Sequence, residues 1–394
     1  MSLHVNDKLI GLLYKFARRL PILKDKFIKF DSLYAQLGAV CEERDTLRAE
    51  LRTILSDRGR LELLNSMLES HEGQTLLLAN CEQGIAKLVT RMALGGEGTD
   101  CCLESGSIPL PVHFYSPVPD VKELQKRNVL SQQTSMPGID MRDTEQIELL
   151  KLLVEQYGHE CSWPSDPVDD SFHYYTNNNS FNYGCAAALH CMIRHFKPRR
   201  VIEIGSGNSS RVLLSALQKN KQESFSAEYS IVDPYPSELL LKIASTGDFV
   251  IHTSCVELLP YSFFDVLGAD DVLFIDSSHV SKTGSDVNYL YLEVLPRLNP
   301  GVIIHIHDIC LPREYPEVYY TSPTFRMFWT EAYILQAFLA FNDQFEVLLA
   351  MIWLQINCRD EFISIMNKVN MEEKWYASSF WLRRKVTNAV RTTH

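Results

Sequence analysis

The spacing of apolar residues changes between strand-like and helical several times in the second half of the chain. Short apolar runs that suit buried strands lie at residues 200–204, 229–232, 249–253, 272–275 and 302–306. Apolar residues at helical spacing lie at 185–195, 210–219, 237–245 and 286–295. Strands that alternate with helices predict βαβ units, in which helices cover both faces of a parallel sheet. The pattern therefore predicts an α/β, Rossmann-like fold.

Further elements flank this region. The pattern predicts helices near 144–157, 330–341 and 361–370, a long strand at 345–354 and a last strand near 378–382. Two upstream segments, His113–Asp120 and Met136–Asp140, contain prolines, which exclude them from helix interiors. We expect residues 109–183 to form an irregular and partly helical cap segment, and residues 184–394 to form the α/β domain.

The amino-terminal region has a coiled-coil-like pattern. Alternating spacings of four and three residues separate Leu33, Leu37, Val40, Arg44, Leu47, Leu51 and Ile54. This is a heptad seam that Arg44 interrupts once. Residues 1–93 are therefore predicted to be an α-helical region for oligomerisation or docking, and the Gly-rich residues 94–108 a linker. We expect a homo-oligomer joined through these helices, with an intramolecular helical hairpin as the alternative.

Charge is distributed unevenly along the chain. There are 38 Lys and Arg residues against 49 Asp and Glu residues, a net charge of −11. Residues 1–30 contain seven of the basic residues and two Asp, so this stretch carries +5 and the rest of the chain −16. Such an acidic balance disfavours nucleic acid as a partner. The basic stretch predicts an amphipathic helix that docks on protein or, alternatively, makes a peripheral contact with an anionic membrane.

Apolar runs and cysteines bear on the location of the protein. The longest apolar run, Val347–Leu354, has eight residues, whereas a membrane-spanning helix needs about 20. No secretory signal is expected at the N-terminus. The ten cysteines are scattered without a CxxC pair, which is typical of free thiols in a reducing compartment. A cytoplasmic location is predicted, at the inner face of a membrane if the basic stretch binds lipid.

A Gly-rich turn joins the first predicted strand to its helix in an E-x-G-x-G motif, Glu203, Gly205 and Gly207. Glycines let the main chain approach a ligand, and the start of a helix offers N–H groups to a carboxylate or a phosphate. A dinucleotide motif would have a third glycine where this chain has Ser210, and an acid about 20 residues further on. Here Asp233 lies 28 residues beyond Gly205. These departures disfavour a nicotinamide cofactor, and a turn without any ligand is the alternative.

Two acidic residues near this turn indicate which chemical groups its ligand carries. Asp233 follows the next strand, where a carboxylate accepts hydrogen bonds from the two hydroxyl groups of a ribose. Glu203, at the end of the first strand, suits a cationic group such as an amine. A ligand that combines a carboxylate, an amine, an adenosine and a sulfonium is S-adenosylmethionine.

Acids and histidines follow two later strands. Asp276 and His279 come after the run at 272–275, and His307 and Asp308 come after the run at 302–306. Because the carboxyl ends of adjacent parallel strands meet at one edge of the sheet, we expect these four side chains to converge. They would form a general base for a hydroxyl group, a divalent metal site, or both. Polar residues that only close the strand ends are the alternative.

These segments together resemble a known family. The sequences RRVIEIGSGNSS, IVDPYP, VLFIDSSHVSKTGSDVNY, LPRLNPGVIIHIHDICLPREYP and SSFWLRRK are similar, in this order, to class I S-adenosylmethionine-dependent methyltransferases. Residues 174–384 look like the branch of metal-dependent sugar O-methyltransferases of antibiotic and polysaccharide pathways, and HFYSPVP and MPGID resemble the upstream segment of that group. The resemblance implies a seven-stranded, mostly parallel sheet and a methyltransferase domain at 184–394.

The resemblance also implies cofactor contacts at the matched positions. The methionine end would be lined by Glu203, Gly205, Ser206, Gly207 and Ser209. The ribose would be held by Asp233 and Pro234, and the adenine would be flanked by Ser254, Val256 and Glu257. Asp276 would complete the cofactor site.

A divalent metal is a further implication. Asp276 matches the first metal-binding acid of the family, and His279 the histidine of its D-x-x-H pattern. His307 and Asp308 lie where metal-dependent relatives carry two acids, so His307 departs from the pattern. A histidine suits Mn²⁺ or Fe²⁺ better than Mg²⁺. The resemblance thus implies Mg²⁺, Mn²⁺ or Fe²⁺ bound by Asp276, His307 and Asp308, and the departure leaves the use of a metal open.

The predicted activity is methyl transfer to a hydroxyl of a sugar, a glycan or a related small molecule. Asp276 and Asp308 would hold the metal, and His279 or His307 would take the proton. Two groups of aromatic residues would form an acceptor wall or simply core: Phe172, Tyr174, Tyr175, Phe181, Tyr183, and Tyr315, Tyr319, Tyr320, Phe325, Phe328, Trp329. The alternatives are N-methylation on the same fold and an inactive scaffold that uses its coiled coil.

Overall fold

The computed structural model describes residues 83–90, 92–93, 99–168, 172–245, 247–322, 326–369 and 377–386. It divides into two compact units, residues 1–120 and residues 121–394, which are treated separately below. The basic stretch 1–30 and the heptad seam 33–54 lie outside the described residues. The coiled coil, the oligomer and the membrane contact therefore stay predictions.

The amino-terminal unit is helical at residues 83–90 and at α6 (Thr99–Glu104), so a short helix lies within the predicted linker. The proline-containing segment after it forms no helix, as predicted. In this segment Phe114 and Tyr115 are exposed, and their ring centroids lie 4.2 Å apart.

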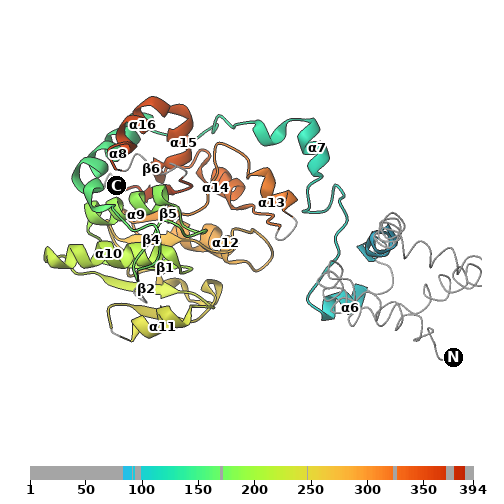
Figure 1. Ribbon diagram of the computed structural model, residues 1–394, viewed down its shortest axis with the longest axis horizontal. Helices are drawn as coiled ribbons and strands as arrows, with labels where there is room; N and C mark the ends of the chain where they lie inside the picture. Colours follow the sequence, from blue (N-terminus) through green and yellow to red (C-terminus); the bar gives the residue numbers. More distant parts are fainter. Residues whose placement is uncertain are drawn as a thin grey trace, which may run out of the picture. The chain divides into compact units, whose positions relative to one another are not determined.

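The second unit contains a seven-stranded sheet with helices on both faces (Figure 1). Its strands are β1 (Arg200–Ile204), β2 (Glu228–Val232), β3 (Val250–His252), β4 (Val272–Ile275), β5 (Ile303–Ile306), β6 (Phe345–Ala350) and β7 (Phe380–Arg384). The strand order is β3-β2-β1-β4-β5-β7-β6, and β7 runs antiparallel to both β5 and β6 while the other pairs are parallel. The predicted α/β, Rossmann-like fold is confirmed.

Alternation along each strand divides the core between the two faces. Val201 and Phe274 face a cluster that includes α8 (Asp143–Tyr157), α9 (Tyr183–Phe196) and α10 (Asn208–Gln222). Ile202 and Ile275 face a second cluster that includes α12 (Asp286–Tyr289) and α14 (Glu331–Leu339). Each central strand is therefore buried on both sides, which explains why most of its residues are apolar.

The remaining helices are short. They are α7 (Val121–Lys126), α11 (Glu238–Ala244), α13 (Glu317–Thr321), α15 (Met351–Asn357) and α16 (Arg359–Met366), with single helical turns at Val129–Ser131, Gly158–Glu160, Val256–Leu258 and Tyr261–Phe263. After α12 the chain continues as a π-helical turn, Leu290–Val294, and a 3₁₀ turn, Leu295–Arg297. Among the described residues, none of the helices has the length and apolar character to cross a membrane.

The predicted strand at 345–354 was wrong in its last four residues. The strand β6 ends at Ala350, and α15 begins at Met351. Ala350, the last residue paired with β7, donates its N–H to the amide oxygen of Gln146 at 2.6 Å. An apolar run does not distinguish a buried strand from a buried helix, and both Met351 and Leu354 are fully buried in the helix that forms.

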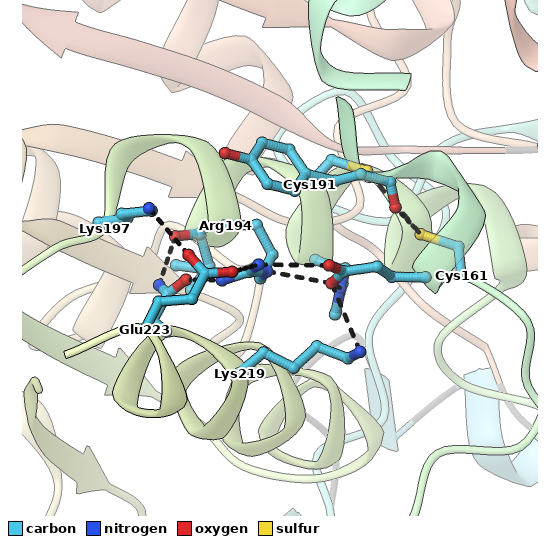
Figure 2. Close-up of polar contacts among 11 residues, drawn as sticks. Cys161, Cys191, Arg194, Lys197, Lys219 and Glu223 are labelled. Atoms are coloured by element: carbon cyan, nitrogen blue, oxygen red, sulfur yellow. Dashed lines mark hydrogen bonds and ion pairs between the residues drawn. The ribbon is translucent and has the colours of Figure 1, made fainter. Parts of the chain in front are cut away.

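A charged network joins the C-terminal ends of α9 and α10 (Figure 2). Arg194 bonds Glu160 at 3.0 Å and also contacts Glu223, which binds Lys197 at 2.9 Å. His190 lies 2.8 Å from the same Glu160 and is fully buried. α9 ends only a few residues before β1 begins, so this network lies at the amino ends of the strands.

The buried side chains of the central strand β4 should contribute strongly to the free energy of unfolding of the second unit. We expect Leu273→Ala to lower the free energy of unfolding by about 2 to 5 kcal/mol, because Leu273 is fully buried and its truncation leaves a cavity. Urea denaturation measures this change. Leu292→Ala is the matched control, since Leu292 is 57% exposed and should change the value by less than about 0.5 kcal/mol. Equal losses in the two variants would contradict this account of the core.

Candidate functional site

Three hydrogen bonds join the carboxyl ends of four parallel strands, β2, β1, β4 and β5, and each donor lies one residue beyond its strand. Gly205 N–H donates to the Val232 carbonyl, and Asp276 N–H donates to the Ile204 carbonyl, both at 2.9 Å. His307 N–H donates to the Ile275 carbonyl, also at 2.9 Å. The glycine turn, Asp276 and His307 therefore lie side by side at one edge of the sheet, as the sequence predicts.

Gly205 is required by this close approach. It has a φ of +82°, in the left-handed region, and an added Cβ would collide with the main-chain oxygen of Asp276 and lie 3.1 Å from its carbonyl carbon. Glycine alone meets both demands. The turn leads into α10, where Gly207 N–H donates to the Ser210 hydroxyl at 3.1 Å. A Cβ on Gly207 would meet no atom within 4 Å, so space is open beside the start of this helix.

Glu203 is buried beneath the turn. Its carboxylate accepts hydrogen bonds from Ser209 at 2.7 Å, from Ser210 at 2.8 Å and from the Tyr229 hydroxyl. Burial raises the pKa of Glu203 to about 7, although these hydroxyl groups lower it. The contacts anchor the start of α10 to β1. The amine contact expected of Glu203, and the cofactor contact expected of Ser209, stay predictions.

Asp233 lies at the end of β2 and is half-buried. It accepts hydrogen bonds from the Ser206 hydroxyl and from the Tyr235 N–H at 2.7 Å. The Ser206 contact connects the glycine turn to the acid that was predicted to hold a ribose. Pro234 follows on the same loop and is half-buried too.

The residues predicted to flank an adenine follow β3. Ser254 N–H donates to the His252 carbonyl at 2.9 Å, and Asp233 N–H donates to the same carbonyl at 3.1 Å. Val256 is buried in the core, while Ser254 and Glu257 are half-buried. The shared carbonyl places this loop next to Asp233.

Asp276 and His279 form a hydrogen-bonded pair, and Glu331 contacts the other nitrogen of the His279 ring. His279 Nε2 lies 3.2 Å from Asp276 Oδ1, and His279 Nδ1 lies 2.6 Å from Glu331 Oε2. Burial lowers the pKa of His279, but the hydrogen bonds to both carboxylates outweigh it and hold the pKa well above its ordinary value. The ring is therefore a doubly bonded imidazolium at neutral pH. Burial raises the pKa of Asp276, but His307 and His279 lower it further, so that Asp276 is ionised.

His307 and Asp308 have other partners. His307 is buried with its ring 4.7 Å from that of Phe181, and its Nε2 lies 3.5 Å from Asp308 Oδ1. Asp308 has a φ of +54° and accepts a hydrogen bond from the Ser378 hydroxyl at 2.7 Å. The sequence placed these two residues at the correct edge but did not reveal Ser378 as a partner.

His305 is a core residue. It lies two residues before His307, with ring centroids 5.6 Å apart. Its ring stacks on Phe274 at 4.2 Å and meets Trp381 at 4.5 Å. Burial lowers its pKa well below the ordinary value, so it is neutral.

The predicted metal ligands do not form a metal site in the part of the chain that the structure describes. No group of three or more His, Cys, Asp and Glu side chains there is arranged to hold a metal ion. Asp276 is turned toward His279 and Asp308 toward Ser378, so the carboxylates bind different partners. The observed arrangement does not fit Mg²⁺, Mn²⁺ or Fe²⁺, and no step below uses one.

The predicted aromatic groups divide between core and site. Tyr174 and Phe181 are buried, with the Tyr174 hydroxyl bonded to the Phe181 carbonyl at 2.7 Å. Trp329 lies 4.3 Å from the His279 ring and is half-buried, and Tyr319 packs against it at 4.9 Å. Trp329 and Tyr319 thus form an aromatic wall beside His279.

Comparisons with known proteins agree with this geometry. A family model described as "Methyltransferase domain" matches residues 202–309. An "Uncharacterized protein" of Archaeoglobus fulgidus is 32% identical over 189 residues, which cover 46% of this chain and 83% of that protein.

Solved structures give weaker likenesses. The structure titled "CmcI-N160 apo-structure" is 14% identical, covers 52% of this chain and 72% of its own, and has a TM-score of 0.34. The plantazolicin methyltransferase BpumL in complex with SAH is 12% identical, with coverage of 68% and 98% and a TM-score of 0.31. TM-scores of this size do not bear on the substrate or on a metal.

Gly205 offers a direct test of the turn. We expect Gly205→Ala to weaken S-adenosylmethionine binding at least about tenfold, because the left-handed φ and the collision with Asp276 force the turn to move. Calorimetric titration measures the affinity, and far-UV circular dichroism checks the fold. Gly268→Ala is the matched control, since its added Cβ would meet Asp271 Oδ2 at an ordinary 3.8 Å. Unchanged affinity in Gly205→Ala would show that the turn is not the binding site.

The buried Glu203 predicts a pH dependence of stability. Its folded pKa of about 7 lies above its ordinary value of 4.5, so the folded state favours the neutral acid. The stabilisation is complete below pH 4.5 and is lost as the pH rises through 7. Relative to Glu203→Gln, the wild type should lose about 2 to 3 kcal/mol between pH 5 and 8. Urea denaturation at several pH values measures this, and parallel curves for the two proteins would refute it.

Proposed function

The chain belongs to the class I S-adenosylmethionine-dependent methyltransferase family, and we propose that it methylates a hydroxyl group of a sugar, a glycan or a related small molecule. The observation that carries the proposal is the position of Asp276. Its main chain meets the glycine turn, and its side chain meets His279. One residue thereby joins the cofactor side of the site to the acceptor side.

The residues at the turn fit S-adenosylmethionine. Open space beside Gly207 and the N–H groups at the start of α10 suit the carboxylate of an amino acid. Asp233 suits two ribose hydroxyls, and the loop from Ser254 to Glu257 lies next to it. When bound there, the cofactor supplies a methyl group that its sulfonium already activates.

Asp276 is the proposed proton acceptor. A hydroxyl oxygen becomes strongly acidic once it bears a new methyl group, so even a carboxylate of low pKa can take its proton. Asp276 is ionised, 29% exposed in its side chain and held by His279. His279 already has a carboxylate at each ring nitrogen and is charged, so its role is to orient Asp276. His307, beside Asp276, contributes to keeping it ionised.

The aromatic wall supports a sugar as the acceptor. The C–H face of a sugar ring packs against an aromatic ring, and its hydroxyls then point to the rim of the ring. Trp329 offers such a surface at 4.3 Å from the His279 ring. A sugar packed there would present a hydroxyl toward the Asp276–His279 pair.

The proposed function is tested by binding and then by turnover. We expect Asp233→Asn to weaken S-adenosylmethionine binding about 10- to 100-fold, because charge-assisted hydrogen bonds contribute about 1.5 to 3 kcal/mol. Calorimetric titration measures the affinity. Asp248→Asn removes an acid that contacts Lys221 at 3.5 Å on the surface and should bind as the wild type does.

Turnover is followed as S-adenosylhomocysteine formed with a panel of methyl glycosides and simple amines. The wild type should methylate a glycoside oxygen, and EDTA should leave the rate within twofold. Methylation of amines alone would replace the proposal by N-methylation. A rate that EDTA abolishes and Mg²⁺ or Mn²⁺ restores would show that Asp276 and Asp308 turn toward a metal. Binding without any transfer would refute the proposed acceptor class.

A further inference from the structure

Glu331 is a buried carboxylate that no local motif of the sequence indicates. It is the first residue of α14 and is fully buried. Its Oε2 lies 2.6 Å from Nδ1 of His279, a residue 52 positions earlier in the chain. A fully buried carboxylate is costly unless it is paired and hydrogen-bonded, and the His279 ring supplies that partner. The pair therefore joins the loop after β4 to the start of α14.

The main chain fixes the same two segments. The His279 carbonyl accepts hydrogen bonds from Thr330 N–H at 2.9 Å and from Glu331 N–H at 3.1 Å. Ser281 N–H donates to the Thr330 hydroxyl at 2.7 Å. His279 itself has a φ of +60°, a left-handed conformation that is strained in a residue other than glycine. Backbone strain that the surroundings enforce in this way is typical of functional sites.

The Glu331 contact decides how the imidazole is oriented. A histidine ring has two nitrogen atoms, and the one that faces a site is set by the hydrogen bond of the other. Because Nδ1 is held by Glu331, Nε2 must face Asp276, which lies 3.2 Å away. Trp329 covers the ring at a centroid distance of 4.3 Å and limits its tilt.

We infer that Glu331 is a positioning residue for methyl transfer: it fixes the His279 imidazole, and His279 in turn fixes the carboxylate of Asp276 at the acceptor hydroxyl. This inference rests on the proposed function. A second consequence follows from the position of Glu331 two residues after Trp329. Glu331 thus also fixes the position of Trp329 in the aromatic wall, so acceptor binding and proton removal both depend on the contact between Glu331 and His279.

Glu331→Gln is the decisive variant, and the chain offers a matched control. Glu160 bonds the buried His190 at 2.8 Å at the opposite end of the strands, in the network of Figure 2. Glu160→Gln therefore removes the charge from another Glu–His pair without touching the site. Both variants should lower the midpoint of thermal unfolding, which makes them comparable in their structural cost.

The spectroscopic readout does not depend on the acceptor. In the full chain with ¹⁵N-labelled histidine, each carboxylate-bonded imidazole N–H should give a slowly exchanging, far-downfield proton resonance. His279→Gln identifies the resonances of His279, and the ¹⁵N shift distinguishes its Nδ1–H from its Nε2–H. Glu331→Gln should abolish the Nδ1–H resonance of His279 and leave the resonance from His190, whereas Glu160→Gln should do the reverse. An Nδ1–H resonance of His279 that survives in Glu331→Gln would overturn the inference.

The kinetic readout separates positioning from simple loss of stability. With the methyl glycoside that the wild type uses, Glu331→Gln should lower kcat about 10- to 100-fold, as expected for a misplaced catalytic group. The affinity for S-adenosylmethionine should stay within twofold, and Glu160→Gln should keep the wild-type kcat. A kcat for Glu331→Gln within twofold of the wild type would overturn the inference. If the wild type methylates no glycoside, the proposed acceptor fails, and the resonance alone decides the role of Glu331.

Discussion

The site depends on the contact between Gly205 and the main chain of Asp276. No side chain fits between them, so β1 and β4 end in register, and the turn after β1 is pressed against the acid after β4. The same turn leads directly into α10, so the start of that helix is fixed relative to Asp276 as well. A single backbone constraint therefore sets the distance between the glycine turn, where we propose that the cofactor binds, and Asp276, the proposed proton acceptor.

Two buried glutamates stabilise this edge in different ways. Glu203 has hydroxyl partners, and its pKa of about 7 lets it become neutral at little cost. Its contacts link β1, β2 and the first turn of α10, which are the elements around the cofactor. Glu331 is hydrogen-bonded to the His279 ring instead, and it links segments far apart in the sequence. Glu203 holds the glycine turn in place through its hydroxyl partners. Glu331 connects His279, beside this turn, to the segment that carries the aromatic wall.

Local sequence patterns predicted the buried strands and the residues that directly follow them. The strands at 200–204 and 272–275 match β1 and β4, and Asp276 lies where the end of a buried strand placed it. The partners of the site residues could not be predicted in this way. Ser378 and Glu331 are distant in sequence, and a serine before a strand or a glutamate in the first turn of a helix has an ordinary local role. The predicted metal ligands illustrate the same limit: Asp308 has a left-handed backbone and accepts a hydrogen bond from Ser378, a contact that no spacing rule reveals.

The imidazolium of His279 explains how two carboxylates and a cationic methyl donor can share one place. Asp276 and Glu331 together carry two negative charges, and His279 carries one positive charge, so the triad has a net charge of −1. That charge complements a sulfonium. When Asp276 takes the acceptor proton it becomes neutral, at the same stage at which the sulfonium becomes a neutral thioether. The total charge of the buried site is therefore the same before and after the reaction. With a carboxylate as the base, the sulfonium and the base are oppositely charged before the transfer and both neutral after it, whereas a neutral imidazole base would end as a cation. A buried site disfavours an isolated charge, so this outcome favours Asp276 as the base.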